Sequence, residues 1–308
     1  MKNRRRVVPG ALHHVYTISR DGGVLFYRVS DRLCLFTVLS VYARKYKVAV
    51  LGLSIMFTHI HLMVRVVDLA QLRAFIGQTL ATFTRIINAD RRKRGELFRR
   101  PFGSAPRVSP KEKRSSLIYL FNNPVEKHLC AKAVDDRWTF LAYSKTPFPF
   151  SKPLIKREVS FRLRRAAECV DAECAAGRYL RPAFLRRLFG GLVKEEQESL
   201  TDYIINKYQF ICFDDAIGLF GDVDRMLLAA EASAGKEFDV GEQFEPLSDV
   251  AYREMAAQAA KNHLFEDWKL LHLSDEEIGR WMRYFRVATT ANDRQIRRFM
   301  HLDQGVRD

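Results

Sequence analysis

The stretch THIHLMVRV, residues 58–66, is the feature that most restricts how this chain can fold. Polar and apolar residues alternate along it, and a period of two residues is typical of a β-strand. Residues two apart on a strand face the same side, so Ile60 and Leu62 would point into a core. His59 and His61 would then project together from the opposite face. The stretch therefore predicts a sheet strand that carries a pair of imidazoles.

The neighbouring segments predict an α+β unit around this strand. Two further runs have the composition of strands, and three segments have the 3.6-residue spacing of helices. The third helix is expected to stop before Pro124, because a residue that precedes proline is pushed out of the α region. The strand runs are 12–19 and 47–57, and the helical segments are 31–46, 68–95 and 109–123.

Charge is distributed unevenly along the 308 residues. Residues 1–150 hold 27 Lys and Arg against nine Asp and Glu, whereas residues 151–308 hold 24 against 27. A positive field so concentrated attracts polyanions, and nucleic acid is the usual one. The first half of the chain is therefore expected to bind a nucleic acid.

The change in charge coincides with TPFPFSKP, residues 146–153, which holds three prolines in eight residues. We expect a domain boundary there, with one domain over 1–148 and a mostly α-helical domain over 149–308. Residues 274–302 have the pattern helix, short turn, helix. That pattern is compatible with a helix-turn-helix that reads DNA and equally with a plain helical hairpin.

Apolar runs and cysteines bear on the compartment. The longest clean apolar stretch, VAVLGLSIMF, is about half of the ~20 residues that a membrane helix needs. Five cysteines are an odd count, and none forms a C-x-x-C pair, so neither a disulfide framework nor a zinc knuckle is indicated. We expect a cytoplasmic protein with no membrane partner.

His59 and His61 can share one divalent ion. Two ligands are too few for a structural zinc site, which closes with four. Two histidines with open coordination positions suit a catalytic cation that also takes a substrate oxygen, such as Mg²⁺ or Mn²⁺. The alternative is that these are polar residues on an exposed sheet face, where H-x-H occurs by chance.

A tyrosine and an amide lie four residues apart in SSLIYLFNNPVEKH, on one face of the expected helix. Near a metal-bound phosphate the phenolate of Tyr119 becomes a usable nucleophile. The carbonyl oxygen of Asn123 could supply a third metal ligand. The alternatives are core packing of Tyr119 beside Leu117 and Phe121, and a capping role for Asn123.

In their order along the chain, four stretches resemble the HUH single-tyrosine transposases, the insertion-sequence family with its repeat-associated relatives. They cover roughly residues 8–145, and H-x-H followed by Y-x-x-x-N-P-V at this distance is fairly specific. The longer C-terminal half is similar to an extended, Bacteroides-type subgroup. The stretches are PGALHHVYTISRDGGVLF, MFTHIHLMV, INADRRKRGELFRRPF and YLFNNPVEKHL.

This resemblance implies a ferredoxin-like antiparallel sheet with helices on one face. It implies that His59, His61 and Asn123 hold Mg²⁺ or Mn²⁺ and that Tyr119 attacks a phosphate of single-stranded or hairpin DNA. Strand transfer would then proceed through a 5′-phosphotyrosine. His14, on the first strand, could orient a metal ligand, touch DNA or sit hydrogen-bonded in the core. Family members include monomers and homodimers that complete each site with the partner's helix.

Two basic stretches flank the expected site in sequence, RRKRGELFRR and KEKR. Cations that neutralise several phosphates give salt-dependent binding, and single strands also stack on aromatic side chains. Phe98, Phe102 and Tyr119 are the aromatic residues available for stacking. The expected phosphate contacts are Arg91, Arg92, Lys93, Arg94, Arg99, Arg100, Lys111, Lys113 and Arg114.

The sequence departs from the family pattern at two places. Phe57 and Thr58 stand where the family often has Pro-Asn, and Arg99, Arg100 and Pro101 stand where it usually has Gln and Arg. These departures bear on which DNA is held more than on the chemistry. Two other functions stay open, a domesticated hairpin-DNA-binding protein without turnover and an HUH nickase of replication or transfer. The second lacks support, because no tyrosine is paired with Tyr119 on its helix and no G-x-x-x-x-G-K-[ST] loop occurs.

Overall fold

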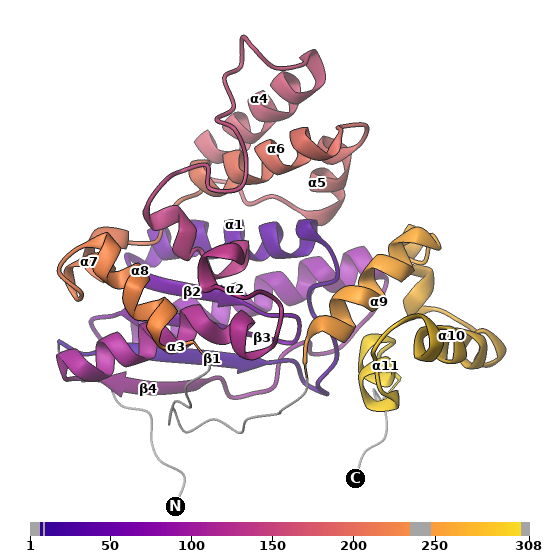
Figure 1. Cartoon of the computed structure of the whole chain (residues 1–308), viewed down its shortest axis with the longest axis horizontal. Helices are drawn as coiled ribbons and strands as arrows, with labels where there is room; N and C mark the ends of the chain where they lie inside the picture. Colours follow the sequence, from indigo (N-terminus) through magenta and orange to yellow (C-terminus); the bar gives the residue numbers. More distant parts are fainter. Residues whose placement is uncertain (1–6, 9, 235–247, 303–308) are drawn as a thin grey trace, which may run out of the picture.

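The computed structural model describes residues 7–8, 10–234 and 248–302. Its sheet has four antiparallel strands in the order β2-β3-β1-β4 (Figure 1). The three strands expected from the sequence are confirmed. The strands are β1 (Leu12–Ile18), β2 (Ala49–Ile55), β3 (His59–Arg65) and β4 (Gly103–Arg107).

Strand β4 was not expected, because its sequence, GSAPR, has no strand character. It lies at the edge of the sheet beside β1, where the missing N–H of Pro106 costs least. Gly103 faces the ring of Tyr16, and a Cβ at position 103 would lie 2.1 Å from that ring. The glycine therefore lets the edge strand approach β1 closely.

Helices cover both faces of the sheet, so the expectation of helices on one face is wrong. Helices α1 (Val29–Tyr46) and α2 (Leu69–Arg91) pack on the face that carries Leu62, whereas α3 (Pro110–Glu126) packs on the face that carries Met63. The reason lies in β3 itself, since consecutive apolar residues point to opposite faces and each face must be covered.

Helix α3 begins as the sequence predicts and ends later. Ser109 and Glu112 form a capping box, in which each side chain accepts a backbone N–H of the other residue. The helix continues through Pro124 to Glu126 instead of stopping at Asn123. Pro124 lies in the last turn, where the donor it lacks removes a single helical hydrogen bond.

The second half of the chain is helical, as expected, and its helices pack in three groups (Figure 1). Helices α4 (Phe161–Ala175), α5 (Pro182–Phe189) and α6 (Lys194–Lys207) share a hydrophobic core with α1, α2 and the sheet. The side chains on either side of the expected boundary at residue 148 therefore belong to one core. The division into 1–148 and 149–308 stays a prediction.

The second group packs against α3, and the third forms a separate hydrophobic cluster with the loop before α1. No helix of the described residues is both long and apolar enough to cross a membrane. The second group is α7 (Phe213–Gly218) and α8 (Val223–Ala232). The third is α9 (Val250–Lys261), α10 (Asp275–Ala288) and α11 (Asp293–Phe299), and short 3₁₀ helices lie at η1 (Ala133–Asp135), η2 (Arg137–Thr139), η3 (Leu141–Ser144) and η4 (Glu266–Leu271).

Helices α10 and α11 form the helical hairpin expected at 274–302. Ile296 and Phe299 of α11 are buried in the third cluster, and Arg294 and Arg297 are exposed. The face of α11 that carries these arginines is therefore the more exposed one. Whether the hairpin reads DNA stays a prediction.

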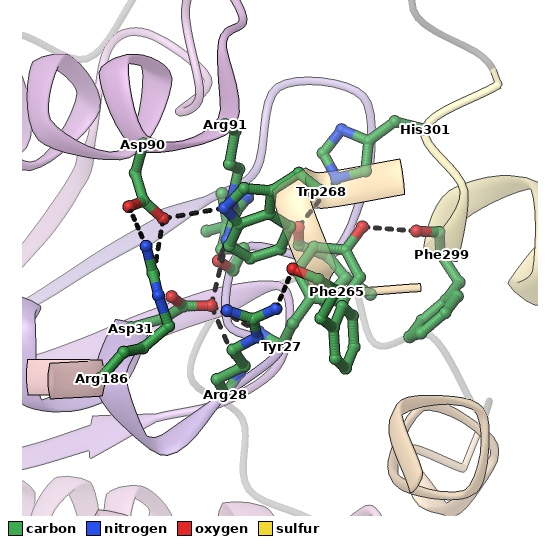
Figure 2. Close-up of polar contacts among 12 residues, drawn as sticks. Tyr27, Arg28, Asp31, Asp90, Arg91, Arg186, Phe265, Trp268, Phe299 and His301 are labelled. Atoms are coloured by element: carbon green, nitrogen blue, oxygen red, sulfur yellow. Dashed lines mark hydrogen bonds and ion pairs between the residues drawn. The ribbon is translucent and has the colours of Figure 1, made fainter. Parts of the chain in front are cut away.

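A buried polar network joins the end of α2 to the other groups (Figure 2). Arg91 forms an ion pair of 3.2 Å with Asp31, and the two side chains are 2% and 0% exposed. The same guanidinium donates to the carbonyl of Leu25 at 2.6 Å. Its remaining face lies over the rings of Tyr27 and Trp268, 5.0 Å and 4.7 Å from their centroids. A buried charge is tolerated here because it is paired, hydrogen-bonded and stacked.

The residue before Arg91 extends this network. Asp90 accepts two hydrogen bonds from Arg186 of α5, at 2.9 Å and 2.6 Å. It also accepts the indole N–H of Trp268 at 2.8 Å. Consecutive residues of α2 thus bind α1, α5 and the C-terminal helices.

Replacing Arg91 with Met tests the network. Removing one partner of a buried ion pair leaves an uncompensated charge on Asp31, so we expect the free energy of unfolding to fall by about 3–5 kcal/mol. Urea unfolding followed by circular dichroism measures this change. The control is Arg92→Met, because that side chain is 73% exposed and its loss should change stability by about 0.5 kcal/mol or less. Equal effects of the two substitutions would contradict the assignment.

Candidate functional site

The antiparallel pairing of β1 and β3 places His14 and His61 on one face of the sheet. His61 lies opposite Tyr16, two residues from His14, and the pleat directs all three side chains to the same face. The two imidazole rings are stacked, with centroids 5.2 Å apart. Nε2 of His14 and Nδ1 of His61 form a hydrogen bond of 3.1 Å. His14 therefore contacts a predicted metal ligand.

His59 and His61 project from the same face of β3, as the alternation predicts. Their ring centroids are 5.0 Å apart, and the ring planes are nearly perpendicular. Nδ1 of His59 forms a hydrogen bond of 3.1 Å with the hydroxyl of Thr58. Both histidines thus engage a neighbour through Nδ1.

Helix α3 places the ring of Tyr119 beside His61 and His14. The ring centroid of Tyr119 lies 5.6 Å from that of His61 and 5.8 Å from that of His14, with edge-to-face geometry in both cases. Tyr119 is 9% exposed. Tyr119 and His61, which the sequence predicts to meet, are thus in ring contact within the same chain.

Asn123 lies one turn beyond Tyr119 on α3 and is buried. Its side-chain nitrogen donates to the backbone carbonyl of Tyr119 at 3.1 Å. That hydrogen bond orients the amide and leaves the carbonyl oxygen as its ligand atom, which is the type that Mg²⁺ and Mn²⁺ take. The metal role of Asn123 stays a prediction.

Burial keeps the two stacked imidazoles neutral. It lowers the pKa of His14 to about 3, and the nearby charge of Arg107 acts in the same direction. Burial, and then the charges of His59 and His14, hold the pKa of His61 well below its usual range. In a hydrogen bond between two neutral imidazoles, one ring nitrogen donates and the other accepts.

This hydrogen bond fits a metal ligand if His61 donates from Nδ1 and His14 accepts. In that tautomer Nε2 of His61 carries a lone pair, and His14 fixes the orientation of the ring. Among the described residues, no group of three or more His, Cys, Asp or Glu is placed to hold a metal ion. A cation at this site would therefore depend on the two imidazoles and the amide of Asn123.

The expected DNA contacts fall into three classes of exposure. Arg91 and Phe98 are buried, so the prediction that they contact DNA is wrong. Arg91 belongs to the ion-pair network, and Phe98 packs against Phe83 in the core, with ring centroids 6.0 Å apart. Three of the expected contacts are partly exposed, namely Lys93, Lys113 and Arg114. Five are exposed, namely Arg92, Arg94, Arg99, Arg100 and Lys111.

Two residues of the site were missed by sequence reasoning. Tyr16 lies 6.1 Å from His14 and 6.4 Å from His61 between ring centroids, and its spacing of two from His14 was the available signal. Arg107 lies on β4, close enough to affect His14. The sequence gave no signal for Arg107, because its strand was not expected.

The lowered pKa of His14 makes stability depend on pH. The unfolded chain binds a proton near pH 6.5 and the folded chain only near pH 3, so stability is complete above pH 6.5 and falls as the pH is lowered through that window. At pH 4.5 we expect a loss of about 2–3 kcal/mol from this residue. Urea unfolding at pH 7 and pH 4.5 measures the loss.

Two variants complete this pH test. His14→Asn should have a smaller difference between the two pH values than the wild type. His128→Asn is the control, because His128 is exposed and its left-handed backbone suits asparagine. It should keep the wild-type difference. The same pH dependence in all three proteins would contradict the assignment to His14.

The structure thus brings the imidazoles of His14, His59 and His61 and the ring of Tyr119 together on one face of the sheet, and the amide of Asn123 follows one turn along α3. These groups come from β1, β3 and α3, which are far apart in the sequence. Comparisons with protein-family models, curated proteins and solved structures found no match to this chain.

Proposed function

We propose that this chain cleaves and rejoins single-stranded DNA through a covalent bond to Tyr119. The observation that carries the proposal is the packing of the Tyr119 ring against His61 and His14, at 5.6 Å and 5.8 Å between centroids. The four-stranded antiparallel sheet supports a ferredoxin-like core of the HUH type. The excess of Lys and Arg in residues 1–150 supports a polyanionic substrate.

The chemistry is a phosphoryl transfer in two steps. The phenolate oxygen of Tyr119 attacks the scissile phosphorus, the bond to the 3′ oxygen breaks, and that oxygen takes up a proton to leave as a 3′-hydroxyl. A 5′-phosphotyrosine remains. A second 3′-hydroxyl then attacks this phosphotyrosine and restores the phenol, so the strand is rejoined without an external energy source.

The surrounding residues prepare this reaction. His59, His61 and Asn123 would hold Mg²⁺ or Mn²⁺, which supplies Lewis-acid polarisation of the phosphate when bound. His14 would orient His61 in the tautomer in which Nδ1 of His61 donates to Nε2 of His14. Four exposed arginines hold phosphates of the strand, namely Arg92, Arg94, Arg99 and Arg100.

A second candidate function is the binding of hairpin DNA without turnover. The observation that favours it is the low exposure of Tyr119. This residue is only 9% exposed, so a DNA phosphate has little access to its hydroxyl group. The two candidates differ in a single observable, which is a covalent bond between protein and DNA.

The first test detects this bond directly. The protein is incubated with labelled hairpin DNA that carries single-stranded flanks, in the presence of Mn²⁺, and analysed on a denaturing gel. We expect a protein–DNA adduct that is lost in Tyr119→Phe, which lacks the nucleophile, and lost with a chelator. Tyr46→Phe, on α1, is the control and should form the adduct. Binding without any adduct across varied substrates would favour the second candidate.

The second test measures the exposed cations. Arg99→Ala and Arg100→Ala should each weaken the binding of single-stranded DNA and lower the slope of log affinity against log salt by about 0.7, because each removes one phosphate contact. Arg286→Ala on α10 is the exposed control and should leave the slope unchanged. Fluorescence anisotropy across a salt series gives these slopes. Unchanged slopes in Arg99→Ala and Arg100→Ala would place the strand elsewhere.

A further inference from the structure

A pocket of about 490 Å³, which includes none of His14, His59 and His61 among its lining residues, lies where the end of α2 meets η4 and α10, and His272 is part of its wall. Its apolar part is formed by Leu264, Leu273 and the half-buried indole of Trp281. Small-molecule sites span roughly 300–1,000 Å³, so this volume suits one small ligand. Residues of the C-terminal helices and of the end of α2 line this pocket.

The polar part of the pocket carries three cations and two carboxylates. Arg92 lies 3.7 Å from Asp267, and Arg280 lies 3.8 Å from Glu277. Both pairs are loose and largely exposed, so they are easily exchanged for other partners. Lys269 adds a further positive charge, which gives these five side chains a net charge of +1. An anion is therefore favoured beside the indole, and carboxylates within reach can accept N–H groups of the ligand.

The backbone of the pocket wall is held in a conformation that L-residues rarely adopt. Asp267 and Trp268 have φ angles of 46° and 56°, in the left-handed region. The side chain of Trp268 is anchored in the core by its hydrogen bond to Asp90. This anchor turns Asp267 outward, where it is 79% exposed at the pocket. Backbone strain of this kind concentrates at ligand sites.

We propose that this pocket binds one nucleotide, with the base stacked on Trp281 and the phosphate held by Arg92, Lys269 and Arg280. A ligand that combines an aromatic ring, N–H donors and a negative charge matches the indole, the carboxylates and the cations at once. Stacking on an aromatic side chain suits every base, because each base has a π-face. The inference rests on the proposed function, in that the nucleotide is an unpaired one of the bound strand, while a free nucleotide has the same chemistry.

The position of Arg92 connects the pocket with strand binding. Arg92 caps the end of α2, and the exposed Arg94 follows two residues later. A strand that contacts these cations passes the mouth of the pocket. An unpaired nucleotide of that strand can then enter it, so the C-terminal helices contribute to the recognition of DNA.

The test uses the full chain in a Tyr119→Phe background, so that no cleavage complicates binding. The first probe is a labelled single-stranded oligonucleotide of 12 nucleotides, and its binding is measured by fluorescence anisotropy. The second probe is dAMP, and its binding is measured by quenching of tryptophan fluorescence. We expect Lys269→Ala and Arg280→Ala to weaken binding of the oligonucleotide about threefold or more, and Trp281→Leu about fivefold or more. Quenching by dAMP should weaken in Lys269→Ala and Arg280→Ala, because both variants keep the reporting indole of Trp281 and lose a phosphate contact.

Two controls guard this test. Arg283→Ala removes an exposed cation of α10 outside the pocket and should change affinity less than twofold. Trp281→Phe keeps an aromatic platform, so it should bind more tightly than Trp281→Leu if stacking is the cause. Wild-type affinity for the oligonucleotide in the Lys269, Arg280 and Trp281 variants, together with wild-type affinity for dAMP in the Lys269 and Arg280 variants, would overturn the inference.

The outcomes separate this inference from the proposed function. An adduct at Tyr119 with no effect of the pocket variants defeats the inference alone. Pocket-dependent binding without any adduct supports the inference and defeats strand transfer. An effect on the oligonucleotide but not on dAMP identifies a nucleotide of the strand as the ligand, and an effect on dAMP alone identifies a free nucleotide.

Discussion

The packing of α3 across β2 and β3 is the contact on which the candidate site depends. Leu117 approaches the sheet at Gly52 so closely that a Cβ there would lie 2.8 Å from its side chain. This close approach sets the distance and register of the helix, and Tyr119 follows two residues later. Because interiors are close-packed, one added methyl group at Gly52 would force the side chain of Leu117 to shift. The position of the Tyr119 ring therefore depends in part on an apolar contact outside the site.

Much of this arrangement could be predicted from the sequence because it follows from short periods. The alternation in β3 predicts that His59 and His61 share a face, and the spacing of four places Tyr119 and Asn123 one turn apart. The stacking of His14 on His61 depends on the register between two strands that are 47 residues apart, which no local pattern contains. Strand β4 was missed for a similar reason, since its pairing with β1 and not its composition makes it a strand.

The basic run after α2 shows where a count of charges misleads. Arg91, Arg92, Lys93 and Arg94 look equivalent in the sequence, but the helix ends at Arg91 and the backbone of Arg92 turns left-handed. The side chain of Arg91 therefore faces the core, where Asp31 and two aromatic rings surround it. Phe98 is also placed by a local backbone contact, because it forms an isolated antiparallel β-bridge with Ser19, the residue that follows β1. The residue at which the helix ends therefore decides which basic side chain is buried in the core.

The indole of Trp268 has a consequence for the architecture as a whole. It closes Asp90 and Arg91 off from water, although it belongs to a segment that follows them by more than 170 residues. A fragment that ended before residue 248 would leave these charges hydrated and the aromatic side of Tyr27 uncovered. The sheet and the C-terminal helices are therefore linked through the contacts of Trp268 with Asp90 and Arg91. A displacement of η4 would disturb the surroundings of both charges at the end of α2.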